Sequence, residues 1–299
     1  MPPPLAPGDR IGIAAPGGPV RKEAFEGGVA YLETRGYLPV LGRHVGRRYA
    51  YLAGSDRERL EDLNALLTDP EIKAIWCARG GYGSGRIVEG LDYGALRRHP
   101  KSIIGYSDVT VLHSAVFKKL GMASWQGPLV SELGDPAAFD ETSLWKALTG
   151  DGRDLSWSLP AASVARPGSG TGPLVGGCLS IVVSLVGTPH EASMDGAVLF
   201  WEEVNEEPFR IDRMLGHLRQ AGRLKNLRGM VIGRLVNCQS KDPLNDMPLR
   251  EILETHLAGT DYPVVVDFPA GHCPGKTTLP FGRSVILDTS ALRLAVSGR

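Results

Sequence analysis

The sequence predicts an α/β fold, with an N-terminal parallel α/β sheet domain and a second, smaller domain of mixed α/β type. Three observations support this: strands and helices alternate in the first half, residues 150–172 are poor in large aliphatic side chains, and the second half is less regular. A chain of 299 residues can also hold two moderate cores. We expect domains at residues 1–155 and 173–299, joined by a linker at 156–172.

The first half has the strand and helix rhythm of a parallel sheet. Strands are expected at residues 10–15, 37–41, 72–78, 102–106 and 122–125, and helices at 21–34, 56–67, 108–120 and 139–148. Ser55 and Glu58 precede the second helix with the spacing of a capping box. Loops that follow the carboxyl ends of parallel strands are candidate walls of a binding site.

The second half contains elements that do not repeat the order of the first. Helices are expected at residues 176–186 and 211–220, strands at 197–201, 229–236 and 263–268, and a closing hairpin at 280–287 and 292–296. This order predicts a mixed α/β domain.

A candidate nucleophile lies where the predicted strand at 102–106 gives way to a helix. Ser107 occupies this turn, and the amide of Asp108 is at the start of the helix. A serine on such a turn projects above the sheet edge, which suits a nucleophile and its oxyanion. An ordinary helix N-cap would look similar. Val109 also stands where the usual nucleophile elbow has a second glycine, so this stretch alone leaves both interpretations open.

A glycine-rich loop, residues 79–85, follows the buried strand at 72–78. The loop lacks the lysine of a Walker motif and the glycine spacing of a dinucleotide site, which argues against a phosphate cradle. A bare backbone amide here can instead supply a second donor to an oxyanion hole. A tight turn without a functional role explains the glycines equally well.

Two strand ends in the second half carry candidate catalytic groups. The apolar run at 198–201 ends in Glu202 and Glu203, and only one of these can point into a given cleft because neighbours on a strand face opposite ways. Acidic runs are also typical of solvated surfaces. His272 follows the strand at 263–268 and a tight turn, and histidine is the commonest general base.

The charge balance and the N-terminus limit the class of protein. Lys plus Arg and Asp plus Glu number 33 each, so no net charge favours nucleic acid or an anionic membrane as a partner. The opening residues, MPPPLAPGDR, lack the basic segment and apolar core of a signal peptide, and no later run approaches the length of a membrane span. We expect a soluble, cytoplasmic protein that binds a small ligand.

The cysteines do not form a recognisable site. Cys77, Cys178, Cys238 and Cys273 are widely spaced and form no Cys-x-x-Cys pair, which argues against zinc binding and against a disulfide framework. We expect reduced thiols. Because neighbouring residues on a strand point apart, a catalytic pair made from His272 and Cys273 is not expected.

Four motifs, in order along nearly the whole chain, resemble those of the LD-carboxypeptidases, a family that includes microcin-immunity-type peptidases. The motifs are Arg-Gly-Gly-Tyr-Gly at 79–83, Gly-Tyr-Ser-Asp-Val-Thr at 105–110, Trp-Glu-Glu at 201–203 with Pro-Phe-Arg-Ile-Asp-Arg at 208–213, and Gly-His at 271–272 with Leu-Pro-Phe-Gly at 279–282. Gly-Gly-Cys-Leu at 176–179 and Gln126 before Gly-Pro depart from the family pattern.

The resemblance implies a serine hydrolase that needs no metal and no cofactor. Ser107 would be the nucleophile, Glu202 would orient the imidazole and His272 would be the base, with the amides of Gly81 and Asp108 as the oxyanion hole. It also implies a homodimer whose two domains face each other across a cleft.

The implied substrate is a small peptide, a cell-wall (murein) tetrapeptide from which a terminal D-amino acid is removed. Arg79 is the candidate for binding the terminal carboxylate. An aminoacyl-nucleotide amide, as in the microcin-immunity type, is the alternative substrate. A non-catalytic, two-lobed small-molecule binding module remains a rival of another class, whereas a nucleotide-dependent transferase would need a phosphate motif that the sequence lacks.

Overall fold

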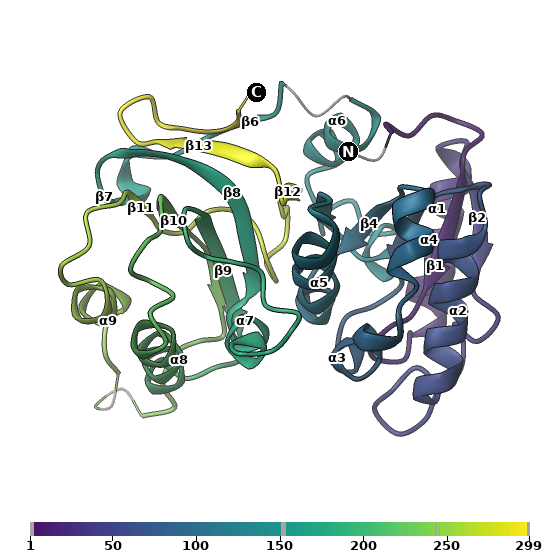
Figure 1. The fold of residues 1–299 in the computed structure, drawn as a ribbon, viewed down its shortest axis with the longest axis horizontal. Coiled ribbons are helices and arrows are strands. Elements are labelled where there is room, and N and C mark those ends of the chain that lie inside the picture. Colours follow the sequence, from purple (N-terminus) through teal and green to yellow (C-terminus); the bar gives the residue numbers. More distant parts are fainter. Residues whose placement is uncertain (1–2, 151–153, 243, 245, 298–299) are drawn as a thin grey trace. The chain divides into compact units, whose positions relative to one another are not determined.

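The computed structural model describes residues 3–150, 154–242, 244 and 246–297. The chain divides into two compact units (Figure 1). Unit 1 comprises Met1–Gly152 and Pro274–Gly282, and unit 2 comprises Arg153–Cys273 and Arg283–Arg299. The segment that follows His272 therefore returns to the first unit before the chain completes the second.

Unit 1 is built on a six-stranded sheet with the strand order β12-β5-β4-β3-β1-β2. The strands are β1 (Arg10–Ala14), β2 (Leu38–Leu41), β3 (Ile72–Cys77), β4 (Ser102–Gly105), β5 (Ser124–Gln126) and β12 (Leu279–Phe281). β1 to β5 pair in parallel, and β12 runs antiparallel to β5. The carboxyl ends of β3, β4 and β5 therefore meet at one edge of the sheet.

Helices connect the strands of this sheet (Figure 1). They are α1 (Lys22–Thr34), α2 (Asp56–Thr68), α3 (Ser84–Ile87), α4 (Tyr93–Arg98), α5 (Thr110–Leu120) and α6 (Glu141–Thr149), with 3-10 turns η1 (Val88–Gly90), η2 (Ser107–Val109) and η3 (Val130–Glu132). The predicted capping box is confirmed, because Ser55 Oγ accepts from the Glu58 amide and Glu58 accepts from the Ser55 amide.

Unit 2 contains an eight-stranded mixed sheet with the order β6-β14-β13-β8-β9-β10-β11-β7. The strands are β6 (Ser156–Ser158), β7 (Val164–Arg166), β8 (Ser169–Cys178), β9 (Val198–Val204), β10 (Gly229–Val236), β11 (Val264–Val265), β13 (Ser284–Asp288) and β14 (Arg293–Val296). β8 to β11 are parallel and the remaining pairs are antiparallel. The helices are α7 (Leu179–Leu185), α8 (Pro208–Gln220), α9 (Leu249–His256) and the 3-10 turn η4 (Ala161–Ser163).

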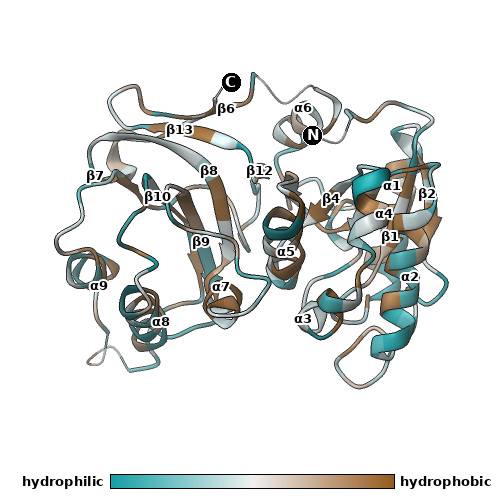
Figure 2. Ribbon diagram, viewed as in Figure 1, coloured by the Kyte–Doolittle hydropathy of each residue, from teal (hydrophilic) through white to brown (hydrophobic). Residues whose placement is uncertain are grey.

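Each sheet supplies a largely hydrophobic layer, whereas α2 and α8 carry many hydrophilic residues (Figure 2). The predicted α/β class is confirmed, and the first sheet is parallel except for its edge strand β12. Among the described residues, no helix combines the length and the apolar character needed to cross a bilayer.

The segment predicted as a linker, residues 156–172, is instead part of the second sheet. It forms β6, β7 and the first residues of β8. Its glycines permit close packing: a Cβ at Gly170 would lie 1.7 Å from the carbonyl oxygen of Arg228, and one at Gly172 would lie 2.1 Å from that of Gly196. The low aliphatic content reflects this close backbone approach and not flexibility.

The predicted closing hairpin is also different, because its first strand is divided between the two sheets. β12 pairs with β5 in unit 1, and only β13 and β14 form a hairpin. The division falls at Gly282, which has φ +82°, and a Cβ there would lie 2.8 Å from a ring carbon of Phe117. The apolar residues at 280–287 therefore read as one strand in the sequence, although they belong to two strands in different sheets.

Candidate active site

Ser107 lies on a strained turn at the end of β4. Its φ is +65°, a left-handed conformation that few residues other than glycine adopt. The four residues of β4 before it are buried, and η2 and then α5 follow at once. The sequence predicted this strand-to-helix turn, and its backbone strain favours a nucleophile over an ordinary N-cap.

The glycine-rich loop after β3 packs directly against Ser107. A Cβ at Gly80 would lie 2.8 Å from Ser107 Cβ and 3.0 Å from Ser107 Oγ, so only glycine fits there. The Gly18 amide donates to the carbonyl of Gly80 at 2.7 Å, which ties this loop to the loop after β1. Gly81, the next residue, is exposed and has φ +95°. Close approach to the candidate nucleophile therefore explains Gly80, whereas a Cβ at Gly81 would meet Gly18 at 3.2 Å.

The side chain of Asp108 has a structural partner. It is buried, and its Oδ2 accepts from the Ser84 amide at 2.8 Å, at the start of α3. A Cβ at Gly17 would lie 2.6 Å from the same oxygen. Because the carboxylate binds the start of α3, the group that Asp108 can offer to a substrate is its main-chain amide.

Buried Glu202 and half-buried His272 form a hydrogen-bonded pair in unit 2. Glu202 lies on β9 and is 0% exposed, and its Oε2 is 2.7 Å from His272 Nδ1. The same oxygen accepts from the His272 amide at 3.2 Å. Gly271, with φ +106°, permits this contact because a Cβ there would lie 2.5 Å from Glu202 Cγ. The carboxylate therefore fixes the position of the imidazole and favours a proton on Nδ1.

Glu203 faces the opposite side of β9, as the alternation of a strand requires. It is buried, so the interpretation of residues 202–203 as a solvated surface is wrong. Its Oε2 accepts from the Ser180 amide at 2.7 Å, at the start of α7, and its Oε1 lies 3.4 Å from Cys178 Sγ. Of the two acids, only Glu202 contacts the imidazole, and Glu203 caps a helix.

His113, which the sequence did not single out, supports the backbone in front of Ser107. It is 1% exposed; its Nε2 lies 2.8 Å from the carbonyl oxygen of Gly105, and its Nδ1 lies 2.8 Å from Ser124 Oγ. Burial lowers the pKa of His113 to about 4, so the ring is neutral near pH 7. Its spacing from Val109 and Val116 places it on the apolar face of α5, the signal by which it could have been found.

The depressed pKa of His113 predicts a loss of stability in mild acid. The unfolded chain takes up a proton near pH 6.5 while the folded protein does so only near 4, so the free energy of unfolding falls as the pH drops between these values. At pH 5 the loss is about 2 kcal/mol relative to pH 7. Urea unfolding at both pH values should show that His113→Gln, although less stable at pH 7, loses less stability on acidification. Equal losses in both proteins would contradict this assignment.

A second polar cluster holds the residue that precedes Ser107. Tyr106 OH donates to Glu132 Oε1 at 2.8 Å, and Lys276 Nζ donates to the same oxygen at 2.9 Å and to the carbonyl of Ala138 at 2.8 Å. Lys276 is buried and lies only four residues after His272 in the chain. These three side chains are distant in sequence, so no local pattern indicated that they meet.

Arg79 and Gln126 have contrasting surroundings. Arg79 is half-buried, and its Nη1 donates to the carbonyl of Pro19 at 2.5 Å. Gln126 pairs with Gly105 between β5 and β4, and its buried side-chain amide has no hydrogen-bond partner among the described residues. Gln126, which departs from the family pattern, therefore places this amide beside β4, the strand that precedes Ser107.

The cysteines are all buried free thiols. Burial raises the pKa of Cys77, Cys178 and Cys238, which disfavours their nucleophilic thiolate forms. Within the described part of the chain, no group of three or more His, Cys, Asp or Glu side chains is arranged to hold a metal ion.

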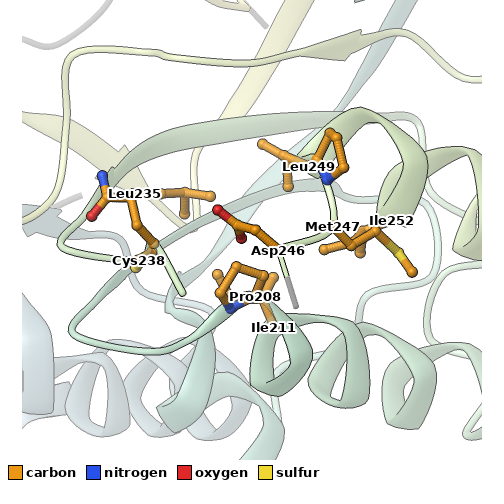
Figure 3. A pocket seen from close by; sticks show the side chains of 10 residues that line it. Pro208, Ile211, Leu235, Cys238, Asp246, Met247, Leu249 and Ile252 are labelled. Atoms are coloured by element: carbon orange, nitrogen blue, oxygen red, sulfur yellow. The ribbon is translucent and has the colours of Figure 1, made fainter. Parts of the chain in front are cut away.

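A pocket of about 250 Å³ lies beside α8 in unit 2 (Figure 3). Its lining includes Pro208, Ile211, Leu235, Cys238, Met247 and Ile252. Neither Glu202 nor His272 lines it, so it is separate from the candidate catalytic pair.

Comparison with known proteins gives matches over both halves of the chain. Residues 11–127 match the LD-carboxypeptidase N-terminal domain, and residues 171–287 match the LD-carboxypeptidase C-terminal domain. A Bacillus subtilis protein described as a probable murein peptide carboxypeptidase is 34% identical, over 96% of this chain and 91% of its own length.

Solved structures extend this similarity to the fold. Muramoyltetrapeptide carboxypeptidase from Oxalobacter formigenes has a TM-score of 0.83 and 29% identity, covering 95% of this chain and 97% of its own. The Escherichia coli microcin C7 self-immunity protein is 28% identical over 98% of this chain and 94% of its own. A structure of the microcin C7 self-immunity protein with aspartyl sulfamoyl adenosine has a TM-score of 0.91 and 25% identity, covering 99% and 98% of the two chains. This chain belongs to the LD-carboxypeptidase family and is a serine peptidase.

Proposed function

We propose that this protein is an LD-carboxypeptidase that cleaves the amide bond between an L-centre and a terminal D-amino acid in murein tetrapeptides. The observation that carries the proposal is the contact of 2.7 Å between Oε2 of buried Glu202 and Nδ1 of His272. An imidazole oriented by a carboxylate is the base that a serine nucleophile requires. Relatives named for murein peptides support the choice of substrate.

In the proposed acylation step, Ser107 of unit 1 acts with Glu202 and His272 of unit 2. Glu202 holds the proton of His272 on Nδ1, so Nε2 takes the proton of Ser107 Oγ as that oxygen attacks the scissile carbonyl carbon. The amides of Gly81 and Asp108 donate to the developing oxyanion. The tetrahedral intermediate then collapses: His272 gives its proton to the leaving nitrogen, the C–N bond breaks, and the terminal amino acid departs.

Deacylation repeats these steps with water. His272 takes a proton from water, whose oxygen attacks the ester carbonyl, and Ser107 Oγ leaves with the proton that His272 returns. The products are the shortened peptide acid and the regenerated enzyme. Every proton is accounted for by Ser107, His272 and water, so the proposed reaction uses no metal and no cofactor.

The same proposal includes the assembly of the protein. The nucleophile belongs to the N-terminal domain and the acid and histidine to the C-terminal domain, and we propose that they act together in a homodimer, as the family resemblance implies. The substrate is a small peptide, and Arg79 is the proposed partner of its terminal carboxylate.

An aminoacyl-nucleotide amide is the second candidate substrate. The observation that favours it is the similarity to a self-immunity protein whose structure contains aspartyl sulfamoyl adenosine. Both substrates would use the same serine, acid and histidine, so the reaction does not distinguish them. The residues that contact the leaving group decide between them.

A panel of substrates tests the proposal. We expect the purified protein to release D-alanine from a peptide ending in an L-centre and D-alanine, and to cleave the matching peptide ending in L-alanine at least about a hundredfold more slowly. Liquid chromatography with mass spectrometry measures the release. Peptides with D,D junctions and an aminoacyl-nucleotide amide complete the panel. Equal rates on the L,L and L,D peptides, or cleavage of the nucleotide amide alone, would contradict the murein assignment.

A further inference from the structure

We propose that a depression beside Gly81 binds the C-terminal carboxylate of the peptide that is cleaved, through Arg48 together with Arg79. The inference rests on the proposed carboxypeptidase function. The depression has a volume of about 600 Å³ and lies entirely within unit 1. Its lining includes both arginines, Tyr51, Tyr82 and Gly81.

The position of this depression suits the leaving group. Gly81 is both part of the lining and a candidate oxyanion donor, and its neighbour Gly80 packs against Ser107. In the substrate, only the amide nitrogen and one α-carbon separate the terminal carboxylate from the scissile carbonyl. A site for that carboxylate must therefore adjoin the oxyanion hole, as this depression does.

The charge of the lining suits an anion. Arg48 is exposed and Arg79 half-buried, and neither guanidinium forms an ion pair with a carboxylate in the described parts of the chain. Arg48 Nε donates a long hydrogen bond of 3.5 Å to the carbonyl of Ala50, and Arg79 Nη1 donates to the carbonyl of Pro19. A guanidinium has five N–H donors in a planar fork that matches a carboxylate, so each arginine retains the capacity to bind one.

Two tyrosines and a strained turn complete the rim. The rings of Tyr51 and Tyr82 are 5.7 Å apart and 63% and 53% exposed as residues. Tyr51 and Arg48 flank Ala50, whose φ of +52° is held by a pair of hydrogen bonds between the backbones of Tyr49 and Leu52. Such strain persists where surrounding contacts fix a loop, and here it presents one guanidinium and one phenol to the same depression.

A matched pair of peptides tests this subsite. The peptides differ only in ending with D-alanine or D-alaninamide, and kcat/KM is measured for the wild type, Arg48→Gln, Arg48→Lys, Arg79→Gln and the control Arg47→Gln. We expect the wild type to prefer the acid by at least about tenfold, because the amide lacks the charge that strengthens hydrogen bonds to arginine. Arg48→Gln should lower kcat/KM for the acid by about tenfold and change it little for the amide.

The variants separate recognition from loop structure. Arg48→Lys should lie between the wild type and Arg48→Gln, and Arg47→Gln, which removes an exposed charge from the same loop, should keep the wild-type preference. Because Arg79 also holds Pro19, Arg48→Gln is the deciding variant. Equal loss on both peptides, or an unchanged preference, would overturn the subsite alone. A wild type that cleaves neither peptide would overturn the proposed function as well.

Discussion

Ser107→Ala should lower turnover of an L,D peptide by about four orders of magnitude or more while the protein remains folded. Removal of the hydroxyl eliminates the attacking atom, and the remaining rate comes from binding and from the oxyanion donors. Steady-state release of D-alanine measures the loss, and circular dichroism with thermal unfolding establishes that the fold is retained. Turnover within about tenfold of the wild type would exclude Ser107 as the nucleophile.

Glu202→Gln should lower turnover by about three to four orders of magnitude, whereas the adjacent Glu203→Gln should have a much smaller effect. The glutamine amide at residue 202 can donate to His272 Nδ1 and so stabilise the wrong tautomer. At residue 203, the glutamine oxygen can still accept from the Ser180 amide, which now binds Glu203 Oε2 at 2.7 Å. The two variants remove the same charge from neighbouring buried positions, so Glu203→Gln is a matched control.

His272→Ala belongs to the same experiment and should be as damaging as Ser107→Ala, because the two residues act as one unit. Kinetics of all three variants on the same peptide give the comparison. If Glu203→Gln were the damaging change and Glu202→Gln were silent, the roles assigned to the two acids would be wrong.

Local sequence patterns were sufficient to predict many of the strands and helices, and which way side chains face on a single strand. An apolar run that ends at a glycine predicted β4 and the turn that carries Ser107, because that signal lies within ten residues. Because side chains alternate along a strand, Glu202 and Glu203 were expected to face opposite ways. Their hydrogen bonds agree: Glu202 binds His272 and Glu203 binds the Ser180 amide. These features depend on neighbours in sequence.

Features that depend on distant segments were not predictable in this way. The glycines of β8 resembled a linker because the carbonyls of Arg228 and Gly196, which require their small size, lie far along the chain. Likewise, the apolar residues around Gly282 gave one strand signal although they divide between two sheets.

Lys276, which supports the candidate site, was missed for the same reason. Lys276 reaches Glu132 across 144 positions of sequence, and no local pattern signals that contact. His113, in contrast, contacts Gly105 only eight positions away, and its place on the apolar face of α5 could have indicated it. The sequence thus indicated the candidate catalytic residues more readily than the residues that hold them in place.

Covalent labelling can establish whether Ser107 is the nucleophile. The wild type is treated with a fluorophosphonate, digested and mapped by mass spectrometry, with and without the L,D peptide as a competitor. We expect a single adduct on Ser107 that the peptide suppresses and that is absent from Ser107→Ala. An adduct on another residue, or no adduct on a protein that still cleaves the peptide, would contradict this expectation.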